Sequence, residues 1–347
     1  MRTWLMVLER FEWLFMCWPV GRLHETKVLN RSRIAVKHWQ DQWVFTLTVL
    51  IVCMTANGFV WSQDVVLPNR ETIRVMSFNI RYATKKDGEN YWGNRKGLVV
   101  DRIKKQEVDV LGVQEAKQEQ WSYLQRALRG YGYVGAGRDD GKRKGEACGI
   151  FYARKRFKLL DKGHVWLSES PKKVGSKSWD SSLPRMFTWV KLKDLRNAKG
   201  KRIEKEGEGV LWVINTHWDH RGKKARLESA KLITAWVDEH VDGQWGEKKV
   251  VVMGDLNCVE GEGPIDVMNE KFVDSYRELN EKSADEGTFN GFKNKKDGRR
   301  IDFVFYDQGL KAVNAEIDQT VVKDKRSGKD RLPSDHFPVV AVFEDSD

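Results

Sequence analysis

Polar side chains end several apolar segments of this chain, at the points where a buried strand would give way to a turn. Carboxylates can hold a divalent cation, amides donate hydrogen bonds, and an imidazole can move protons. Such a set supports metal-assisted or acid-base chemistry if the fold brings its members together. The residues at these positions are Asn79, Glu115, His217, Asp255 and Asn257.

Each of these residues alone is also typical of ordinary turn chemistry. Asn79 and Asn257 suit a turn, and Asp255 suits a helix cap. The triplet Ser334-Asp335-His336 and Asp302, which lies within an apolar run, add further polar groups of the same kind. So many coincidences favour a shared site over a set of unrelated loops.

The segments that carry these residues alternate between two patterns from residue 72 onward. Short apolar runs predict buried strands, whereas apolar residues at helical spacing, such as Leu227, Ala230, Ile233 and Val237, predict helices. Alternation of this kind predicts an α/β fold, in which the ends of the strands open on one edge and form the usual crevice for ligands. The expected strands cover residues 73–80, 108–115, 149–152, 210–217, 250–257, 301–306 and 339–343. Weaker helical patterns surround Leu98 with Ile103 and Trp121 with Leu124 and Leu128.

Composition removes several classes of protein. The 347 residues are 40% hydrophobic, which is enough for a substantial core and excludes a disordered tail or a disulfide miniprotein. No glycine-rich dinucleotide or phosphate-binding loop is present, and the four cysteines form no CxxC pair that would indicate zinc. The net charge of +11 favours polyanionic partners such as nucleic acid or anionic head groups.

Six motifs in order resemble the endonuclease/exonuclease/phosphatase superfamily, over roughly residues 72 to 345. The resemblance implies a four-layer α/β sandwich of the DNase I type, with two mixed β-sheets packed face to face and helices outside. It also implies hydrolysis of a phosphoester with a divalent cation, usually Mg²⁺, with Mn²⁺ as the alternative. The motifs are MSFNIR (76–81), GVQE (112–115), NTHWDH (215–220), GDLN (254–257), RRIDFVFY (299–306) and SDHFPV (334–339).

The same resemblance assigns the metal ligands. Glu115 matches the principal ligand of the family, Asn79 matches the amide beside it, and Asp335 matches a further carboxylate near the metal. One firm carboxylate with help from an amide is sufficient, because Mg²⁺ keeps several of its waters.

Five further residues match the groups that carry the reaction. Asp255 matches the carboxylate that deprotonates the attacking water, and Asn257 matches a hydrogen-bond donor to the phosphoryl oxygens. His217 and His336 match the two histidines that contact the phosphate, and Asp302 matches the carboxylate paired with the second histidine.

Two residues are expected to contact the substrate. Tyr152 lies where family members often place an aromatic residue or an arginine toward the phosphate, and packing in the core is the alternative. Arg185 has the planar guanidinium that suits phosphate oxygens, and a salt bridge is the alternative. Four neighbouring residues line the crevice or begin a loop in this interpretation, without a catalytic role: Trp179, Asp180, Asp219 and His220.

The N-terminal segment has a different pattern from the rest. Residues 43–54 form an uncharged apolar run behind Arg31, Arg33 and Lys37, which is the arrangement of a secretory signal, and an uncleaved membrane anchor could extend the run to residue 60. We therefore divide the chain into an N-terminal segment, 1–64, and a catalytic domain, 65–347. We expect a protein that is exported to the periplasm or the medium, or anchored in the membrane.

These observations favour an Mg²⁺-dependent phosphodiesterase of the nuclease type acting on nucleic acid. Residues 296–301 (KDGRRI) lack the signature of the inositol 5-phosphatases, and residues 163–189 resemble a bacterial branch grouped with deadenylase-like nucleases. The alternatives are a phosphomonoesterase or phospholipase-like enzyme acting on a small molecule or a lipid head group, and a nucleic-acid-binding module that has lost catalysis. We expect a monomer and infer no protein partner.

Overall fold

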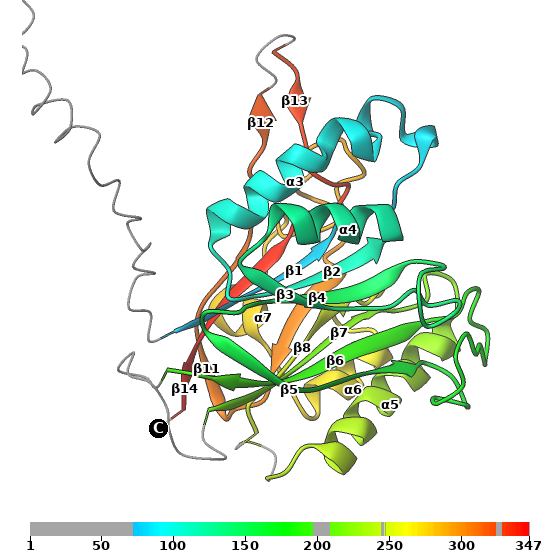
Figure 1. The fold of residues 1–347 in the computed structure, drawn as a ribbon, viewed down its shortest axis with the longest axis vertical. Helices are drawn as coiled ribbons and strands as arrows, with labels where there is room; N and C mark the ends of the chain where they lie inside the picture. Colours follow the sequence, from blue (N-terminus) through cyan, green and yellow to red (C-terminus); the bar gives the residue numbers. More distant parts are fainter. Residues whose placement is uncertain (1–71, 197–208, 244–245, 247, 324–327, 347) are drawn as a thin grey trace, which may run out of the picture. The chain divides into compact units, whose positions relative to one another are not determined.

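Two six-stranded sheets form the centre of the computed structural model (Figure 1). In the first sheet the order is β11-β14-β1-β2-β4-β3, and only β1 and β2 run parallel. Its apolar strands are short and mostly buried, as expected for strands covered on both faces. Their bounds are β1 Ile73–Asn79, β2 Val110–Ala116, β3 Tyr131–Val134, β4 Ala147–Ala153, β11 Leu310–Ile317 and β14 Val339–Asp345.

The second sheet has the order β5-β6-β7-β8-β10-β9, and here β7 and β8 are the parallel pair. Each sheet is therefore mixed, with one parallel pair at its centre. A small two-stranded ribbon, β12 Val322–Lys323 with β13 Asp330–Arg331, lies apart from both sheets. The strands of the second sheet are β5 Phe157–Trp166, β6 Met186–Asp194, β7 Val210–His217, β8 Val250–Asp255, β9 Val273–Asp274 and β10 Asp302–Tyr306.

Helices cover the outer face of each sheet. Apolar side chains of α3 and α4 pack on the first sheet around Val99, Ile103 and Leu124, while those of α5 and α6 pack on the second sheet around Ile233 and Ile265. A third cluster fills the space between the sheets. The helices are the 3₁₀ helix η2 Lys85–Asn90, α3 Trp92–Gln106, α4 Gln118–Ala127, α5 Lys223–His240, α6 Gly263–Asn269 and α7 Ser275–Leu279. The predicted four-layer sandwich is confirmed.

The two sheets approach closely near their parallel pairs. A Cβ atom on Gly112 of β2 would lie 2.8 Å from Met253 Sδ and 2.9 Å from Asn215 Cγ, so only glycine fits there. Asn215 of β7 spans the gap and donates to the carbonyls of Val113 (2.9 Å) and Gly149 (2.8 Å). A polar contact inside an apolar core fixes the relative position of the sheets, because any displacement leaves buried groups unpaired.

The structure describes residues 72–196, 209–243, 246, 248–323 and 328–346. The N-terminal segment 1–64, with its predicted signal or anchor, lies outside these residues. Within the described ranges, no helix is both long enough and apolar enough to cross a membrane.

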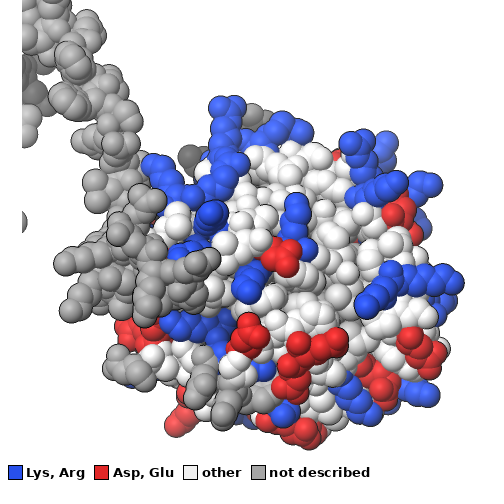
Figure 2. All heavy atoms as spheres, turned by 60° about the horizontal axis from the view of Figure 1, so that its bottom comes forward, with Lys and Arg blue, Asp and Glu red and all other residues white. Residues whose placement is uncertain are grey.

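Basic side chains are spread over the surface in separate places. On the face drawn in Figure 2, lysines and arginines are interleaved with neutral surface, and aspartates and glutamates gather over its lower half. On that face the positive charge forms no continuous stripe of the kind that tracks a nucleic-acid backbone.

Candidate active site

The candidate site lies at the edge of the sandwich where the parallel strands end. Because β1 and β2 are parallel, and so are β7 and β8, the carboxyl ends of each pair meet at one edge. In the second sheet, Asp255 ends β8 and has two neighbours in register: His217 at the end of β7 and Asp302 at the start of β10. The register alone therefore places three of the predicted residues side by side.

Asp255 is the centre of the hydrogen-bond network. Its Oδ2 accepts a hydrogen bond from Asn79 Nδ2 (2.9 Å), and its Oδ1 accepts one from the backbone N–H of Asn257 (2.9 Å). Two imidazole nitrogens are also near Oδ2: His217 Nε2 at 3.5 Å and His336 Nε2 at 3.8 Å. Burial, followed by the charge of Asp302, raises the pKa of Asp255. A buried carboxylate with a raised pKa suits a group that must accept a proton.

His336 is oriented by Asp302. Its Nδ1 lies 2.8 Å from Asp302 Oδ2, so the carboxylate holds a proton on that nitrogen and leaves Nε2 facing Asp255. Burial alone would lower the pKa of His336, but the charge of Asp302 and the hydrogen bond to it raise this pKa to about 10. His336 is therefore cationic at neutral pH and can stabilise negative charge or donate a proton.

Glu115 comes from the first sheet through a local distortion of β2. The register between β2 and β4 shifts between Val113 and Ala116, and Glu115 has a φ of 60°, a left-handed conformation that is uncommon for any residue but glycine. Its Oε2 accepts a hydrogen bond from the N–H of Tyr82 at 3.0 Å. The bulge turns the carboxylate away from the strand pattern and toward the edge, and strain of this kind clusters at functional sites.

Asn79 connects the two carboxylates of the site. Its Oδ1 accepts a hydrogen bond from the N–H of Arg81 (3.0 Å), which fixes the orientation of the amide. Its Nδ2 therefore faces the carboxylates and lies 2.9 Å from Asp255 Oδ2 and 3.3 Å from Glu115 Oε1. In this geometry Asn79 positions Asp255 and Glu115 through Nδ2, and its role as a metal ligand through Oδ1 stays a prediction.

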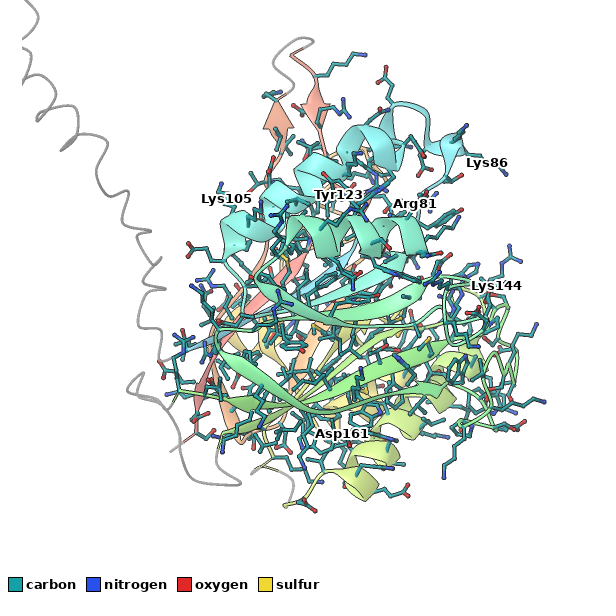
Figure 3. All side chains as sticks on the ribbon, in the orientation of Figure 1. Arg81, Lys86, Lys105, Tyr123, Lys144 and Asp161 are labelled. Atoms are coloured by element: carbon teal, nitrogen blue, oxygen red, sulfur yellow. The ribbon has the colours of Figure 1, made fainter. Side chains whose placement is uncertain are left out.

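Asp335 completes the carboxylates of the site. It lies 3.7 Å from the guanidinium of Arg81, which Figure 3 labels at the same edge of the sandwich as Lys144. Burial raises the pKa of Asp335, and the nearby charge of Glu115 adds to the shift although His336 opposes it. The half-buried Glu115 and the buried Asp335 repel each other in this way, and a divalent cation between them would relieve the repulsion.

Arg95 of α3 holds the two loops that carry these groups. Its guanidinium is fully buried and donates to the carbonyls of Ile80 (2.6 Å) and Arg81 (2.8 Å) on one side and of Pro333 (2.9 Å) on the other. One arginine thus fixes the segment after β1 and the segment before His336 relative to each other.

His217 and Asn257 form the other side of the site. Asn257 Nδ2 lies 3.0 Å from His217 Nε2 and also donates to the carbonyl of Trp218 at 3.0 Å. Asn257 has a φ of 51°, the second strained non-glycine residue at this edge. Burial and then the charges of Arg185 and Arg138 lower the pKa of His217 well below its usual value, so it is neutral at pH 7.

The two expected substrate contacts have different outcomes. Tyr152 pairs with Val110 at the start of β2, whereas Glu115 lies at the other end of that strand, and the ring of Tyr152 packs between the sheets. The expectation that Tyr152 faces the phosphate is therefore corrected, because β4 runs antiparallel to β2 and carries this residue away from the site. Arg185 does line the cavity beside His217.

The four residues without an assigned role have structural partners. Asp219 accepts from the N–H groups of Gly222 (2.8 Å) and Arg221 (2.9 Å) before α5, and Asp180 accepts from Ala225 (2.7 Å) at the start of that helix. His220 lines the cavity, and Trp179 has a φ of 55° in the loop that Asp180 anchors. These contacts fix the loop before β6 against α5.

Sequence reasoning missed two charged residues of the site, Arg138 and Glu146. Both line the cavity, and Arg138 Nη1 donates to Glu146 Oε2 at 2.7 Å. They belong to the charged run RDDGKRKGE between β3 and β4, whose composition is typical of a solvated loop, and only the tip of this run is exposed. The ends of this run face the cavity only because the loop folds back on itself. The spacing of residues in the sequence does not reveal that fold.

All of these groups surround one cavity of about 490 Å³, which is the size of a small-molecule site. Glu115, His217 and Asp255 each offer one ligand atom within 4.8 Å of the others, and so do Asp255, Asp302 and His336. Six of the predicted catalytic and metal-binding residues line the cavity: Glu115, His217, Asp255, Asn257, Asp335 and His336. Asn79 and Asp302 lie directly behind, in contact with Asp255 and His336 respectively.

Comparison with protein families gives a match over most of the described chain. The model of the endonuclease/exonuclease/phosphatase family matches residues 76–336, from the first predicted motif to the last catalytic histidine. A search of curated proteins gives no match.

Solved structures with the same architecture come from several organisms. An endonuclease/exonuclease/phosphatase from Bacteroides vulgatus is 32% identical, covers 79% of this chain and 99% of its own, and has a TM-score of 0.69. A mannosyl-6-phosphatase from Bacteroides thetaiotaomicron is 33% identical, covers 78% of this chain and 99% of its own, and has a TM-score of 0.68. The catalytic domain of human Nocturnin shares the fold at 19% identity, with coverage of 79% and 94% and a TM-score of 0.58.

Proposed function

Because the chain belongs to the endonuclease/exonuclease/phosphatase family, whose members hydrolyse phosphoesters with a divalent metal, we propose that it is an Mg²⁺-dependent phosphomonoesterase. The observation that carries the proposal is the enclosed cavity of about 490 Å³, in which Arg138 and Arg185 lie beside the catalytic groups. A terminal phosphate carries up to two negative charges, and arginines in addition to a metal favour such a dianion over a singly charged diester. The similarity to a mannosyl-6-phosphatase supports the same class of substrate.

Glu115 and Asp335 would hold the metal, because their carboxylates repel each other and face the cavity. Mg²⁺ is the preferred ion for an all-oxygen site that keeps several waters, and Mn²⁺ is the alternative. When bound, the cation would neutralise charge on the phosphate oxygens.

The side chains of the site have separate roles in the proposed reaction. Asp255, held by Asn79 and by the N–H of Asn257, accepts the proton of the attacking water. His336, kept protonated by Asp302, stabilises the charge that develops on the phosphoryl group or donates a proton to the leaving oxygen. Asn257 and Arg185 supply further hydrogen-bond donors on the other side of the cavity.

The test is an assay of the full-length protein on matched synthetic esters. We expect phosphate release from p-nitrophenyl phosphate that requires Mg²⁺ and stops on chelation with EDTA, with slower turnover of bis-p-nitrophenyl phosphate. Turnover of neither ester, nor of a panel of natural phosphomonoesters, would contradict the proposal.

A nuclease-type phosphodiesterase is the second candidate. It is favoured by the net charge of +11 and by the motifs that predicted it. The separate placing of basic residues on the face in Figure 2 argues against an extended nucleic-acid track on that side. Faster cleavage of DNA, RNA or the synthetic diester than of any monoester would decide for this candidate.

We further propose that the protein acts outside the cytoplasm as a monomer, either exported or anchored by residues 43–60. The uncharged run behind Arg31, Arg33 and Lys37 supports export. Recovery of the intact chain from the soluble cytoplasmic fraction of its native cells would contradict this proposal.

A further inference from the structure

One wall of the cavity is charged but lies apart from the carboxylates that fit the metal. It consists of Arg138 and Glu146 from the loop between β3 and β4, together with Arg185 and His220. None of these residues has a part in activating water or in holding Asp255. We therefore ask which part of the substrate, other than the phosphate, these residues contact.

The loop that carries Arg138 and Glu146 is fixed by its own backbone. Arg138 N–H donates to the carbonyl of Glu146 (3.1 Å), and Asp139 N–H donates to that of Lys144 (3.1 Å). The buried Trp166 Nε1 also donates to the carbonyl of Arg138 at 2.7 Å. Figure 3 shows Lys144 of this loop at the same edge as Arg81. The ion pair is thus presented by a preorganised loop, which is how a binding site keeps its ordering cost low.

The wall offers both kinds of hydrogen-bonding group. Arg138 Nη1 donates to Glu146 Oε2, and the two side chains are 10% and 16% exposed. Arg185 is 97% buried, lies 3.4 Å from Asp219 and 3.0 Å from His220 Nδ1, and its Nη1 has no hydrogen-bond partner among the described residues. Leaving a buried donor unpaired is unfavourable, so we expect an acceptor from a ligand to complete this site.

The mouth of the cavity is apolar. Leu183 (38% exposed) and Phe289 (37% exposed) both line it, and they belong to the small set of large hydrophobic side chains that the described chain leaves exposed. A ligand that fits must therefore accept a hydrogen bond from Arg185 and donate one to Glu146. It must also pack on the apolar side chains of Leu183 and Phe289.

A sugar or similar polyol has these properties. Each hydroxyl both donates and accepts, which suits Arg185 and Glu146 together, and the C–H face of the ring packs on aromatic or aliphatic carbon. A second phosphate is disfavoured by the carboxylate of Glu146, and a lipid chain offers nothing to the charged wall. We propose that Glu146, held in place by Arg138, recognises the hydroxyl groups of the leaving group beside the phosphate that the arginines bind, so that the substrate is a sugar or polyol phosphate. The inference rests on the phosphomonoesterase proposed above.

The experiment compares substrates with and without hydroxyl groups in the leaving group. Full-length parent and Glu146→Gln are assayed with Mg²⁺ on a panel of hexose 6-phosphates, on glycerol phosphate and on p-nitrophenyl phosphate. We expect Glu146→Gln to lower kcat/KM on the preferred sugar phosphate by about 10- to 100-fold, mainly through KM, because a charged hydrogen bond is lost. Turnover of p-nitrophenyl phosphate should stay within about twofold. Glu169→Gln, an exposed carboxylate outside the cavity, is the matched control and should change neither.

Each result has a separate meaning. If the parent hydrolyses p-nitrophenyl phosphate but prefers no hydroxylated ester over ethyl phosphate, the inference is wrong and the phosphomonoesterase stands. If no monoester is hydrolysed, the proposed function itself fails. An equal loss on all substrates in Glu146→Gln would assign this pair to folding or catalysis and overturn its role in recognition. Arg138→Lys, which keeps the charge but not the planar donor fork, should lower turnover of every ester, because Arg138 also faces the phosphate, and thermal melts establish that both variants are folded.

Discussion

At the end of the sandwich opposite the site, buried carboxylates are paired with arginine. Arg156 donates from Nε to Asp194 Oδ2 (2.8 Å) and from Nη1 to Asp109 Oδ2 (2.9 Å) and the carbonyl of Thr72 (2.7 Å). We call this group the Arg156 network. Both carboxylates are in direct contact with the arginine, and its positive charge offsets part of the cost of burying them.

At the site edge, similar residue types are arranged without such pairing. Asp255, Asp302 and His336 lie within 4.8 Å of one another, Asp302 Oδ1 is buried without a hydrogen-bond partner, and no arginine donates to these carboxylates among the described residues. The backbone at Glu115 and Asn257 is strained as well. The fold therefore maintains a destabilised edge, which is the expected cost of a preorganised site for a cation and a phosphate.

The comparison shows that burial of charge alone does not identify a functional site. Both ends of the strands contain buried aspartates, but only the end opposite the site pairs them with arginine, whereas the cation beside Asp302 is the imidazolium of His336. The difference predicts that changes at the site edge affect turnover and leave stability intact, whereas changes in the Arg156 network have the reverse effect.

The largest expected effect is on turnover in Asp255→Asn. Loss of the proton acceptor should lower kcat by about 10²- to 10⁴-fold, since that is the usual contribution of a general base. Because the amide removes the repulsion with Asp302, the thermal stability without metal should stay equal or rise. Steady-state kinetics and a thermal melt measure the two effects. Asp266→Asn, on the exposed face of α6, is the control, and a marked loss of stability in Asp255→Asn alone would break the comparison.

The second prediction concerns the opposite end. Arg156→Met leaves Asp109 and Asp194 buried without the cation that they share, which should lower the free energy of unfolding by about 3–5 kcal/mol. Below the unfolding temperature, kcat should stay near that of the parent, because the network touches no group of the cavity. Denaturant unfolding with Arg126→Met, an exposed arginine of α4, as control measures the effect. A stability equal to that of the control would show that the two ends do not differ as described.

Strands could be predicted from the sequence where burial on both faces produces a continuous run of apolar residues. Strands such as β8 (VVVMGD) are covered on both faces and read as continuous apolar runs, so both their position and the polar residue at the end were predictable. Among the strands that were not predicted, β5 and β6 are the outer two on their side of the second sheet, and between its two buried end residues β5 has only exposed or half-buried residues, several of them charged. Such a segment resembles a loop until its partner is known.

The site could be predicted in part for the same reason. Residues at strand ends follow from register, as His217, Asp255 and Asp302 do. The role of Asn79 depends on which amide atom faces Asp255, and the role of Glu146 depends on a loop that folds back through Arg138. Neither is encoded in the spacing of residue types.

The third prediction tests whether a cation is what the site edge lacks. Glu115→Gln keeps the shape of the side chain but removes its charge, so the Mg²⁺ concentration for half-maximal activity should rise at least about 10- to 100-fold, the range known for groups that merely support a ligand. In Asp255→Asn this concentration should stay nearly unchanged while the maximal rate falls. Activity across an Mg²⁺ titration decides between them. If Glu115→Gln and the parent require the same Mg²⁺ concentration, Glu115 is not a metal ligand.

The smallest expected effect concerns Asp318, a paired carboxylate directly after β11, which accepts from Nη1 of Arg102 and, at 2.7 Å, from Gln106 Nε2. Burial raises the pKa of Asp318, but hydrogen bonds from Arg102, Thr320 and Gln106 outweigh it and lower this pKa from 3.8 to about 2. The folded state therefore binds this proton less readily than the unfolded state, and the stabilisation is complete above pH 3.8 and disappears as the pH falls toward 2. Asp318→Asn should be less stable than the parent by on the order of 1 kcal/mol at neutral pH, after allowance for solvent screening, and equally stable near pH 2. Urea unfolding of both proteins across this range measures the gap. A gap that stays constant down to the lowest pH would mean that packing, and not the charge of the ion pair, stabilises this contact.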